Sequence, residues 1–360
     1  MQHTTIGYRI LIDTPHDYPN RHTSGTQTHL SKMTRRKVVN ALLTSMVGSP
    51  GCSISSRRIL AQLMAICDSG GFAIIGARLG LNSNNELVPS AIAVAGDDAG
   101  QLLLQESVPP HLLSLAPDGI WVAWVPESSL PDPYGRGGHP LVCITNDSQL
   151  TRPVTYSGWF GTKVALSSGA VHLALISMGE VGSAQSRRLS LIDPRTGESL
   201  DDLTKVISGY DLAKVERLRL SSSGKQLIVG WPDSFFVINL QRRAILLRGK
   251  GRFPSISPSG DEIAFVAPNQ KLVVLTLATG LTREPLTQGQ TYGVGSWTPD
   301  GKLLFAFVRA PLALNAKLIA IDCRTGLSAE ITSLDEWNLG QNCALIKKRL
   351  LSATPRLSSS

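Results

Sequence analysis

Charged residues are scarce in this sequence, and so are several patterns that identify common classes of protein. Asp, Glu, Lys and Arg make up 17% of the 360 residues, whereas apolar residues make up 42%. A disordered chain has the opposite balance, with many charges and few apolar residues. No uninterrupted apolar run reaches 18 residues, so no segment is required by its composition to span a membrane. The sequence therefore predicts a globular fold with a substantial core.

Signatures of metal sites and of common catalytic sites are also missing. The five cysteines are an odd number without C-x-x-C spacing, which argues against a zinc site or a disulfide framework. The sequence contains no G-x-S-x-G, no H-E-x-x-H and no phosphate-binding G-x-x-x-x-G-K-[ST]. We expect no metal and no cofactor, and we assign no catalytic residue.

The positive charge is concentrated at the N-terminal end. The formal net charge is +8, and residues 1–71 account for +5 of it with eight Lys or Arg against three Asp, leaving +3 for the rest. A nucleic-acid-binding domain usually carries a dense basic stripe on its folded part. The short clusters at 241–243 and 347–349 do not form one, so we expect no nucleic-acid partner.

The first 71 residues divide into two parts. Residues 1–32 are polar and without periodicity, which predicts a disordered lead-in, and Met33 is a more plausible native start than Met1. Residues 33–71 begin with the basic cluster Arg35-Arg36-Lys37, followed by a moderately apolar run and a small-residue exit before Cys52. That order is typical of a signal peptide and favours export to the periplasm. The alternatives are one or two short amphipathic helices in a cytoplasmic protein, or a membrane tether through this segment.

From residue 72 onward, short apolar runs alternate with turns, which is typical of many short strands. One turn element recurs five times, with its glycines 50, 55, 36 and 41 residues apart, and an apolar or alternating strand follows each copy. Pro presets the first corner, Asp or Ser bonds to nearby backbone N–H groups, and Gly adopts the positive φ that closes the hairpin. The residues assigned to these turns are Pro117, Asp118, Gly119, Gly169, Gly224, Pro258, Gly260, Pro299, Asp300 and Gly301.

A second hairpin follows at a similar offset and carries Asp193 and Asp322 in Asp-x-x-Thr-Gly turns. Two hairpins per unit of roughly 40 residues is typical of a β-propeller. The repeated position of these aspartates favours turn bonding over catalysis. Trp297 likewise occupies a repeat position that is apolar in the other four copies, so we expect it in the core.

The combination of an S-P-D-G-like turn and a D-x-x-T-G turn resembles the TolB-type propeller repeats, a WD-like family, over about residues 112–334. The resemblance implies a propeller that is typically periplasmic and that bridges envelope proteins. Two copies, at 167–169 and 221–224, lack both Pro and Asp. The head does not match the small α/β domain that precedes the propeller in that family, so a role in the Tol system itself does not follow.

We therefore predict an all-β fold, a β-propeller of four-stranded antiparallel blades over residues 72–355, with a disordered tail at 356–360. Six blades are preferred and seven are the alternative. Five units carry the marked turn, and residues 72–110 form a degenerate sixth. The strand candidate Asn342–Ile346 either completes the first blade or starts a partial seventh.

Loop insertions in the second and third units are the best candidates for recognition, because binding residues concentrate on loops held by a rigid scaffold. The candidate binding residues are Asp132, Tyr134, Arg136, His139 and Trp159. The favoured function is a non-catalytic, monomeric scaffold that binds a protein or peptide through its loop face or central channel. The alternative is a lactonase, lyase or glycosidase in the channel. It would require converging acids or histidines, of which the strand residue His172 is the one example, and a fully hydrogen-bonded core histidine is the simpler expectation.

Overall fold

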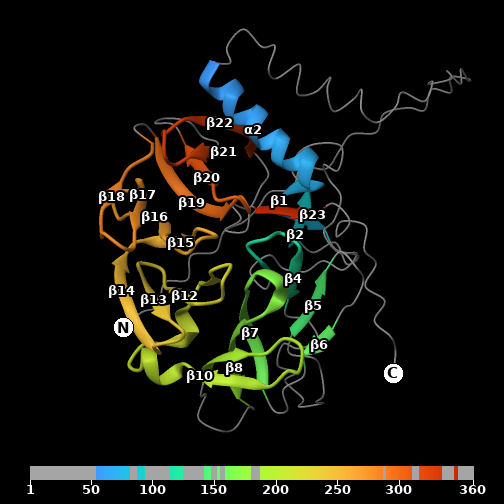
Figure 1. The fold of residues 1–360 in the computed structure, drawn as a ribbon, viewed down its shortest axis with the longest axis vertical. Helices are drawn as coiled ribbons and strands as arrows, with labels where there is room; N and C mark the ends of the chain where they lie inside the picture. The colour runs from blue at the N-terminus through green and yellow to red at the C-terminus, as the bar shows by residue number, and fades with distance from the viewer. Residues whose placement is uncertain are drawn as a thin grey trace, which may run out of the picture.

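The computed structural model of this chain describes residues 54–81, 87–93, 113–124, 142–146, 152–154, 159–179, 187–286, 289–309, 316–334 and 344–347. Within these residues it contains one α-helix, five four-stranded antiparallel sheets and one three-stranded antiparallel sheet. The sheets follow one another around a central axis (Figure 1). This arrangement confirms the all-β propeller that the repeats predict.

The blades are numbered here in chain order, and their strands are given from the central channel outward. Blade 1 contains β23 (Ala344–Lys347), β1 (Phe72–Leu81) and β2 (Leu87–Ala93). Blade 2 contains β3 (Leu113–Leu115), β4 (Trp121–Trp124), β5 (Val142–Asn146) and β6 (Arg152–Val154). Blade 3 contains β7 (Trp159–Leu166), β8 (Leu173–Gly179), β9 (Arg187–Ile192) and β10 (Ser199–Asp202). Blade 4 contains β11 (Arg217–Leu220), β12 (Gln226–Gly230), β13 (Ser234–Asn239) and β14 (Ala244–Lys250). Blade 5 contains β15 (Arg252–Ile256), β16 (Glu262–Val266), β17 (Leu272–Thr276) and β18 (Thr282–Arg283). Blade 6 contains β19 (Gln290–Trp297), β20 (Leu303–Arg309), β21 (Ala316–Asp322) and β22 (Ser328–Leu334).

The ring closes by pairing the two ends of the propeller. Strand β23 runs antiparallel to the start of β1, with Phe72 opposite Lys347 and Ile75 opposite Ala344. The last strand thus covers an edge of the first blade that would otherwise present unpaired N–H and C=O groups. Of the two expectations for the tail strand, completion of the first blade is the one observed, and the described residues form six blades.

Apolar clusters between neighbouring blades hold the ring together. One cluster lies between each successive pair from blade 2 to blade 6, and another joins blade 6 to β1. Phe235 in blade 4 and Phe305 in blade 6 are among the largest fully buried side chains. Burying a side chain of this size contributes about 1.5–3 kcal/mol relative to leaving it exposed. The blade faces therefore carry the core, and the middle strands are apolar on both sides.

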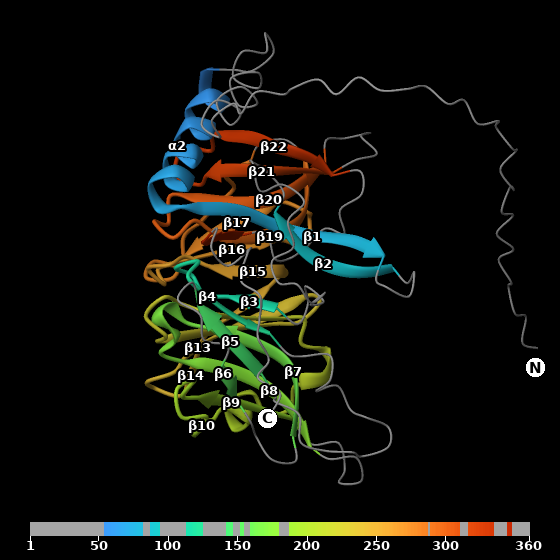
Figure 2. The ribbon, with the colours of Figure 1, turned by 90° about the vertical axis from the view of Figure 1, so that its right-hand side faces the viewer.

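Helix α2 (Ile54–Gly70) packs against this ring rather than standing apart from it. Ile59, Leu60 and Leu63 are buried against blade 6 and β1 because the i, i+1, i+4 spacing puts them on one helix face. Figures 1 and 2 show α2 lying along β21 and β22 and ending beside β1. Over Ile54–Gly70 the helical expectation is confirmed; residues 34–53 lie outside the described part of the chain. None of the helices in the described residues is long and apolar enough to cross a membrane.

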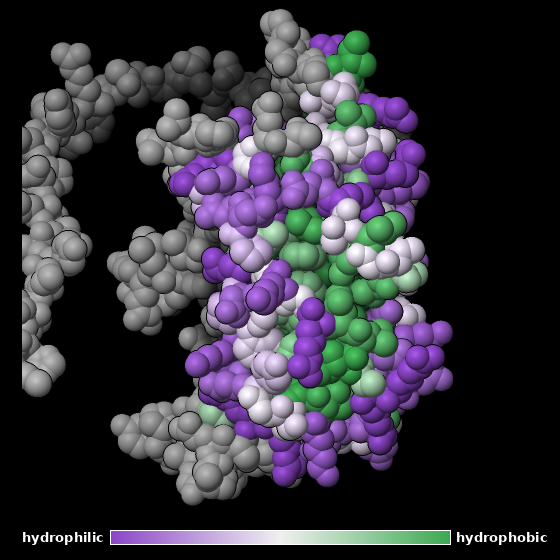
Figure 3. All heavy atoms as spheres, turned by 90° about the vertical axis from the view of Figure 1, so that its left-hand side faces the viewer, coloured by the Kyte–Doolittle hydropathy of each residue, from purple (hydrophilic) through white to green (hydrophobic). Residues whose placement is uncertain are grey.

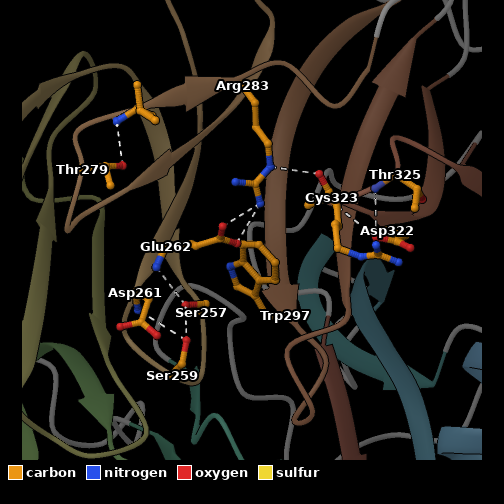
Figure 4. Close-up of polar contacts among 12 residues, drawn as sticks. Ser257, Ser259, Asp261, Glu262, Thr279, Arg283, Trp297, Asp322, Cys323 and Thr325 are labelled. Carbon is orange, nitrogen blue, oxygen red and sulfur yellow. Dashed lines mark hydrogen bonds and ion pairs between the residues drawn. The ribbon is translucent and has the colours of Figure 1, made fainter.

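A polar tie joins blades 5 and 6 outside the apolar cluster. Arg283 on β18 forms an ion pair with Glu262 on β16, with a shortest N–O distance of 2.7 Å. Its Nε donates to the carbonyl oxygen of Cys323 in blade 6 at 3.0 Å (Figure 4). Burial raises the pKa of the Cys323 thiol above its usual range, since the thiolate would lose its solvation there. Cys323 therefore acts as a small apolar core residue beside this tie.

The outer side of blades 4 and 5 exposes an apolar strip. In Figure 3, which faces the left-hand side of Figure 1, apolar side chains gather over the outer strands of these blades. Leu246 on β14 is 44% exposed, and Leu281, just before β18, is 70% exposed. Strand β18 is only two residues long, whereas β14 has seven, so the outer edge of blade 5 is short.

Candidate functional site at the central channel

The candidate loop residues fall mostly outside the structure's described part. Asp132, Tyr134, Arg136 and His139 lie in 125–141, of which nothing is described. Trp159 is the first residue of β7, and its backbone is opposite Gly179 on β8. The binding role of this loop therefore stays a prediction.

The turn residues form one ring of hairpins at the ends of the inner strands. All five turn glycines, at 119, 169, 224, 260 and 301, have φ between +64° and +84°, where a Cβ would be strained. The Asp118 carboxylate accepts from the N–H of Ile120 in its own turn at 2.9 Å and from that of Gly169 in the next blade at 2.7 Å. The glycines of Ala116–Gly119 and of its repeats thus close their own hairpin turns, and Asp118 also links blade 2 to blade 3. Pro117, Pro258 and Pro299 lie at the corresponding corner.

The other turn carboxylates bond to their own hairpins. Asp300 accepts from the Thr298 hydroxyl at 2.6 Å and from the N–H of Lys302 at 3.1 Å. Asp193 accepts from the N–H of Arg195 at 2.7 Å, and Asp322 from that of Arg324 at 2.9 Å. Each of these carboxylates is engaged within its turn. In the residues described, His, Cys, Asp and Glu form no group of three that could hold a metal ion.

His172 sits beside the turn of the next blade. A Cβ added at Gly224 would lie 2.3 Å from its Nδ1, so the imidazole packs tightly on that turn. The expectation of a fully hydrogen-bonded histidine is wrong, because the buried Nδ1 has no hydrogen-bond partner in the described region.

The inner strands of blades 2 to 6 each place one residue at the same position of the repeat, five residues before the turn glycine. Counting five residues back from each turn glycine gives Ser114, Val164, Arg219, Ser255 and Ser296. We call these five positions the channel tier. Four of them are polar, although Ser114 is only 1% exposed and Ser255 only 2%.

A cavity opens onto this tier. It offers about 30 Å³ to the centres of water molecules, which is room for roughly two or three waters. Its polar wall consists of Ser114, Arg219, Ser255 and Ser296. The remaining wall is formed by Leu115, Ala116, Pro117, Leu166, Leu220, Ile256, Pro258 and Trp297. The cavity is thus polar on the channel tier and apolar elsewhere.

Trp297 has the core position that the repeat predicts. It is buried in the cluster between blades 5 and 6, and its indole N–H donates to the carbonyl oxygen of Ser255 at 3.3 Å. The same side chain forms part of the cavity wall. A core residue therefore also shapes the candidate site.

Arg217 precedes Arg219 by two residues on β11, so the two side chains lie on the same face of the strand. The Arg217 side chain is 3% exposed, and its Nη1 donates to the carbonyl oxygen of Val294 at 2.7 Å. Val294 belongs to blade 6, so this side chain from blade 4 reaches past the inner strand of blade 5. In the part of the chain that is described, its Nε and Nη2 have no hydrogen-bond partner. A buried guanidinium with two unused donor atoms is uncommon, because buried polar groups are normally satisfied.

Burial lowers the proton affinity of the cations in this region. Desolvation lowers the pKa of Arg217 well below its ordinary value, the charge of Arg219 lowers it further, and Glu216 partly opposes both. Burial also lowers the pKa of Arg219, to about 10. The pKa of Lys163 on β7 is lowered by burial and by Arg219, while Glu216 raises it. Glu216 is thus a carboxylate that acts on both Arg217 and Lys163.

Neither Arg217 nor Arg219 is among the candidate residues predicted from the sequence. The segment Arg217-Leu218-Arg219-Leu220 alternates charged and apolar residues, which ordinarily predicts a strand with its arginines in solvent. A usable signal was present nonetheless: the position five before the turn glycine is polar in four of five copies. Aligning the copies on that glycine shows the channel tier directly.

Comparison with known proteins supports the fold and leaves the activity open. No family model matches the sequence, and no curated protein matches it. Among solved structures, TolB from Acinetobacter baumannii is similar, with a TM-score of 0.51 and 14% identity, over 86% of this chain and 71% of that one. Hydrazine synthase from Kuenenia stuttgartiensis gives a TM-score of 0.41 and 16% identity, over 65% of this chain and 69% of that one. The similarity to TolB confirms the β-propeller fold predicted from the repeats.

Proposed function

We propose that this chain is a non-catalytic propeller scaffold that binds a protein or peptide partner at the central channel, next to the ring of repeat turns. The observation that supports it most is the cavity at the channel tier, where Arg219 and three serines from different blades face one small space. Grooves and channels that combine apolar walls with a few convergent polar groups are the usual form of a binding site. The turn carboxylates accept hydrogen bonds within their own hairpins, and Asp118 also accepts one from the next blade.

The experiment places a photo-reactive amino acid at one of two positions and looks for a covalent partner in cells of the source organism. Pro258 lies at the cavity wall, and Leu246 lies on the outer strand of blade 4. We expect a discrete cross-linked partner from position 258 and none from position 246. The same partner at both positions, or none at 258, would contradict binding at the channel.

The loop at 131–140 is proposed as a second contact at the partner's edge. Its candidate residues Tyr134, Arg136 and His139 offer stacking, charge and a switchable donor. Replacing 131–140 by a short Gly-Ser linker should weaken capture of the partner cross-linked at position 258. Unchanged capture would remove the loop from the binding site.

We also propose that the chain is exported and works in a bacterial cell envelope. The signal-like order of residues 34–52 supports this, as does the start of α2 at Ile54, because cleavage before residue 53 would leave the packed helix intact. Mass spectrometry of the mature chain should find its N-terminus between about residues 45 and 53 in the periplasmic fraction. An intact Met1 or Met33 in the cytoplasmic fraction would refute export.

A further inference from the structure

The outer strand of blade 4 is rich in positive charge and contains no acidic residue. Residues 241–252 include five Lys or Arg and no Asp or Glu. Four of these cations are exposed on β14 or on the turn before it: Arg242, Arg243, Arg248 and Lys250. Arg243 forms an ion pair with Asp201 on β10 at 2.8 Å, whereas the other three form no ion pair with any described residue. The outer rim of blade 4 therefore offers positive charge to an anionic partner.

The spacing of these cations makes their electrostatic potentials add. Arg248 and Lys250 are two residues apart, which is about 7 Å along an extended strand. That distance is shorter than the screening length of about 8 Å at physiological ionic strength. The guanidinium of Arg248 lies over the ring of Phe236, 5.3 Å from its centroid, which holds the cation in place without neutralising it.

Exposed leucines accompany this charge. Leu246, in the middle of β14, is 44% exposed, and Leu281, just before β18 in blade 5, is 70% exposed. In Figure 3 the apolar strip over these outer strands has hydrophilic side chains on both sides. Apolar patches with a polar border are typical of protein or membrane interaction sites. A surface of anionic lipid suits the combination, because its headgroups attract cations and its acyl boundary accepts apolar side chains.

The shape of β14 argues against the alternative of a protein strand added at this edge. Leu246 is an extra residue in the pairing with β13, whose register shifts between Val237 and Ile238. Such a bulge bends the strand, and Lys or Arg side chains on an edge also discourage strand addition. A nucleic acid fits less well than lipid, because it would place charged phosphates against the exposed leucines.

We propose that the rim of blade 4, formed by Arg242, Leu246, Arg248 and Lys250, is a peripheral docking surface for a membrane of anionic phospholipid. Strand β14 lies on the outside of the ring (Figure 1), whereas inner strands form the wall of the cavity at the channel tier. A membrane on the rim therefore leaves the channel open to its partner. The inference is independent of binding at the channel, since it uses none of the cavity residues.

The first experiment measures how the full chain partitions onto lipid vesicles, followed by co-sedimentation. The probe is phosphatidylcholine vesicles with about one third phosphatidylglycerol, and pure phosphatidylcholine vesicles are the neutral comparison. The rim variant is Arg248→Gln/Lys250→Gln. The control variant, Arg195→Gln/Arg324→Gln, removes two exposed cations from turns of blades 3 and 6.

Each cation close to an anionic membrane strengthens partitioning about fivefold. We therefore expect the rim variant to bind the anionic vesicles about 25-fold more weakly than the wild type, and the control variant to bind nearly as tightly as the wild type. Equal binding of the wild type to both kinds of vesicle would overturn the docking surface. So would an equal loss in the two variants, because net charge alone would then explain binding.

A second variant tests the apolar part of the surface. We expect Leu246→Ser to weaken binding to the anionic vesicles roughly threefold or more, because the leucine loses its contact with the acyl boundary. The control Val171→Ser, at a 49% exposed position between β7 and β8, should leave binding unchanged. Unchanged binding in Leu246→Ser would overturn the lipid surface, and competition by soluble polyglutamate would then identify an acidic protein as the ligand.

Photo-labelling provides a direct measurement that does not depend on the folding of the rim variants. A photo-reactive amino acid at position 246 of the full chain should form an adduct with phosphatidylglycerol in the anionic vesicles, and the same amino acid at position 258 should form none. A lipid adduct at 258 alone, or at neither position, would overturn the docking surface. Because the channel experiment detects cross-linked protein and this one detects lipid, the two proposals can fail separately.

Discussion

Replacing Arg217 by Met should stabilise the ligand-free protein, although arginine is the larger and more polar side chain. The substitution removes a buried cation with two donor atoms that lack partners in the described residues. Methionine keeps a flexible side chain in the same place, with a volume similar to that of the aliphatic part of arginine. The substitution therefore measures the free-energy cost of burying the charge while the packing around the side chain is largely kept.

The magnitudes favour a net gain. Losing the charge-assisted hydrogen bond from Arg217 to the Val294 carbonyl costs about 1.5–3 kcal/mol. Each unsatisfied buried donor costs about 1–3 kcal/mol, and burying an unbalanced ion costs several kcal/mol more. The neighbouring charge of Arg219 adds repulsion. We expect Arg217→Met to raise the free energy of unfolding by about 1–4 kcal/mol, the range found when buried charges are replaced by apolar residues.

Urea denaturation at low ionic strength, followed by tryptophan fluorescence, measures this change. Urea is preferable to guanidinium chloride, because chloride would screen or occupy the site. The slope against urea should not change, since the same surface is exposed on unfolding.

A loss of about 2 kcal/mol or more in Arg217→Met, with no loss in the control variant Arg242→Met on the exposed β13–β14 turn, would refute the reasoning. Arg217 would then be a structural tie between blades 4 and 6 whose hydrogen bond outweighs the burial of its charge.

Three further predictions concern the turns, the helix and pH. Gly224→Ala should destabilise the protein by roughly 2 kcal/mol or more, because the new Cβ would collide with the imidazole of His172. The control Gly280→Ala has a similar φ of +70° but open space around it, so it should cost about 1 kcal/mol in the same denaturation assay. Leu63→Ala should cost about 2–5 kcal/mol, whereas Ile54→Ala, at an 88% exposed position on the same helix, should change little. Between pH 8 and about pH 10.5 the protein should gain stability relative to an Arg219→Met control, because burial lowers the pKa of Arg219 to about 10, so near and above that pH the unfolded chain binds more protons than the folded one.

The fold was predictable because its signals are local and repeated. Each hairpin turn needs a residue with positive φ, and glycine at one fixed position meets that need in five copies. Ring closure was predictable only as one of two alternatives. Pairing of β23 with β1 joins residues as far apart as Phe72 and Lys347, and no local pattern specifies that contact.

The candidate site was harder to predict because burial in a propeller depends on position in the ring. Arg217 and Arg219 lie on a strand whose alternation usually indicates one face in water. Here the strand is the innermost of its blade, so the face away from the core meets other inner strands instead.

Helix α2 is the opposite case, in which residues that resemble a signal sequence belong to the core. The Arg57-Arg58-Ile59-Leu60 segment suits a signal sequence, yet Ile59 and Leu60 are buried against blade 6 because the helical period turns them to one side.

The separation of core and channel explains how this chain can hold an unbalanced buried charge. The apolar clusters that stabilise the ring lie between blade faces. The channel tier lies at the inner edges of blades 2 to 6, and four of its five residues line one small space. A destabilising residue at one tier position therefore affects a site that contributes little to the apolar core. Val164 is the exception, because it belongs both to the tier and to the cluster between blades 2 and 3. The cavity wall can thus change at Ser114, Arg219, Ser255 and Ser296 without unfolding the ring, whereas a polar residue at 164 would disturb the cluster between blades 2 and 3.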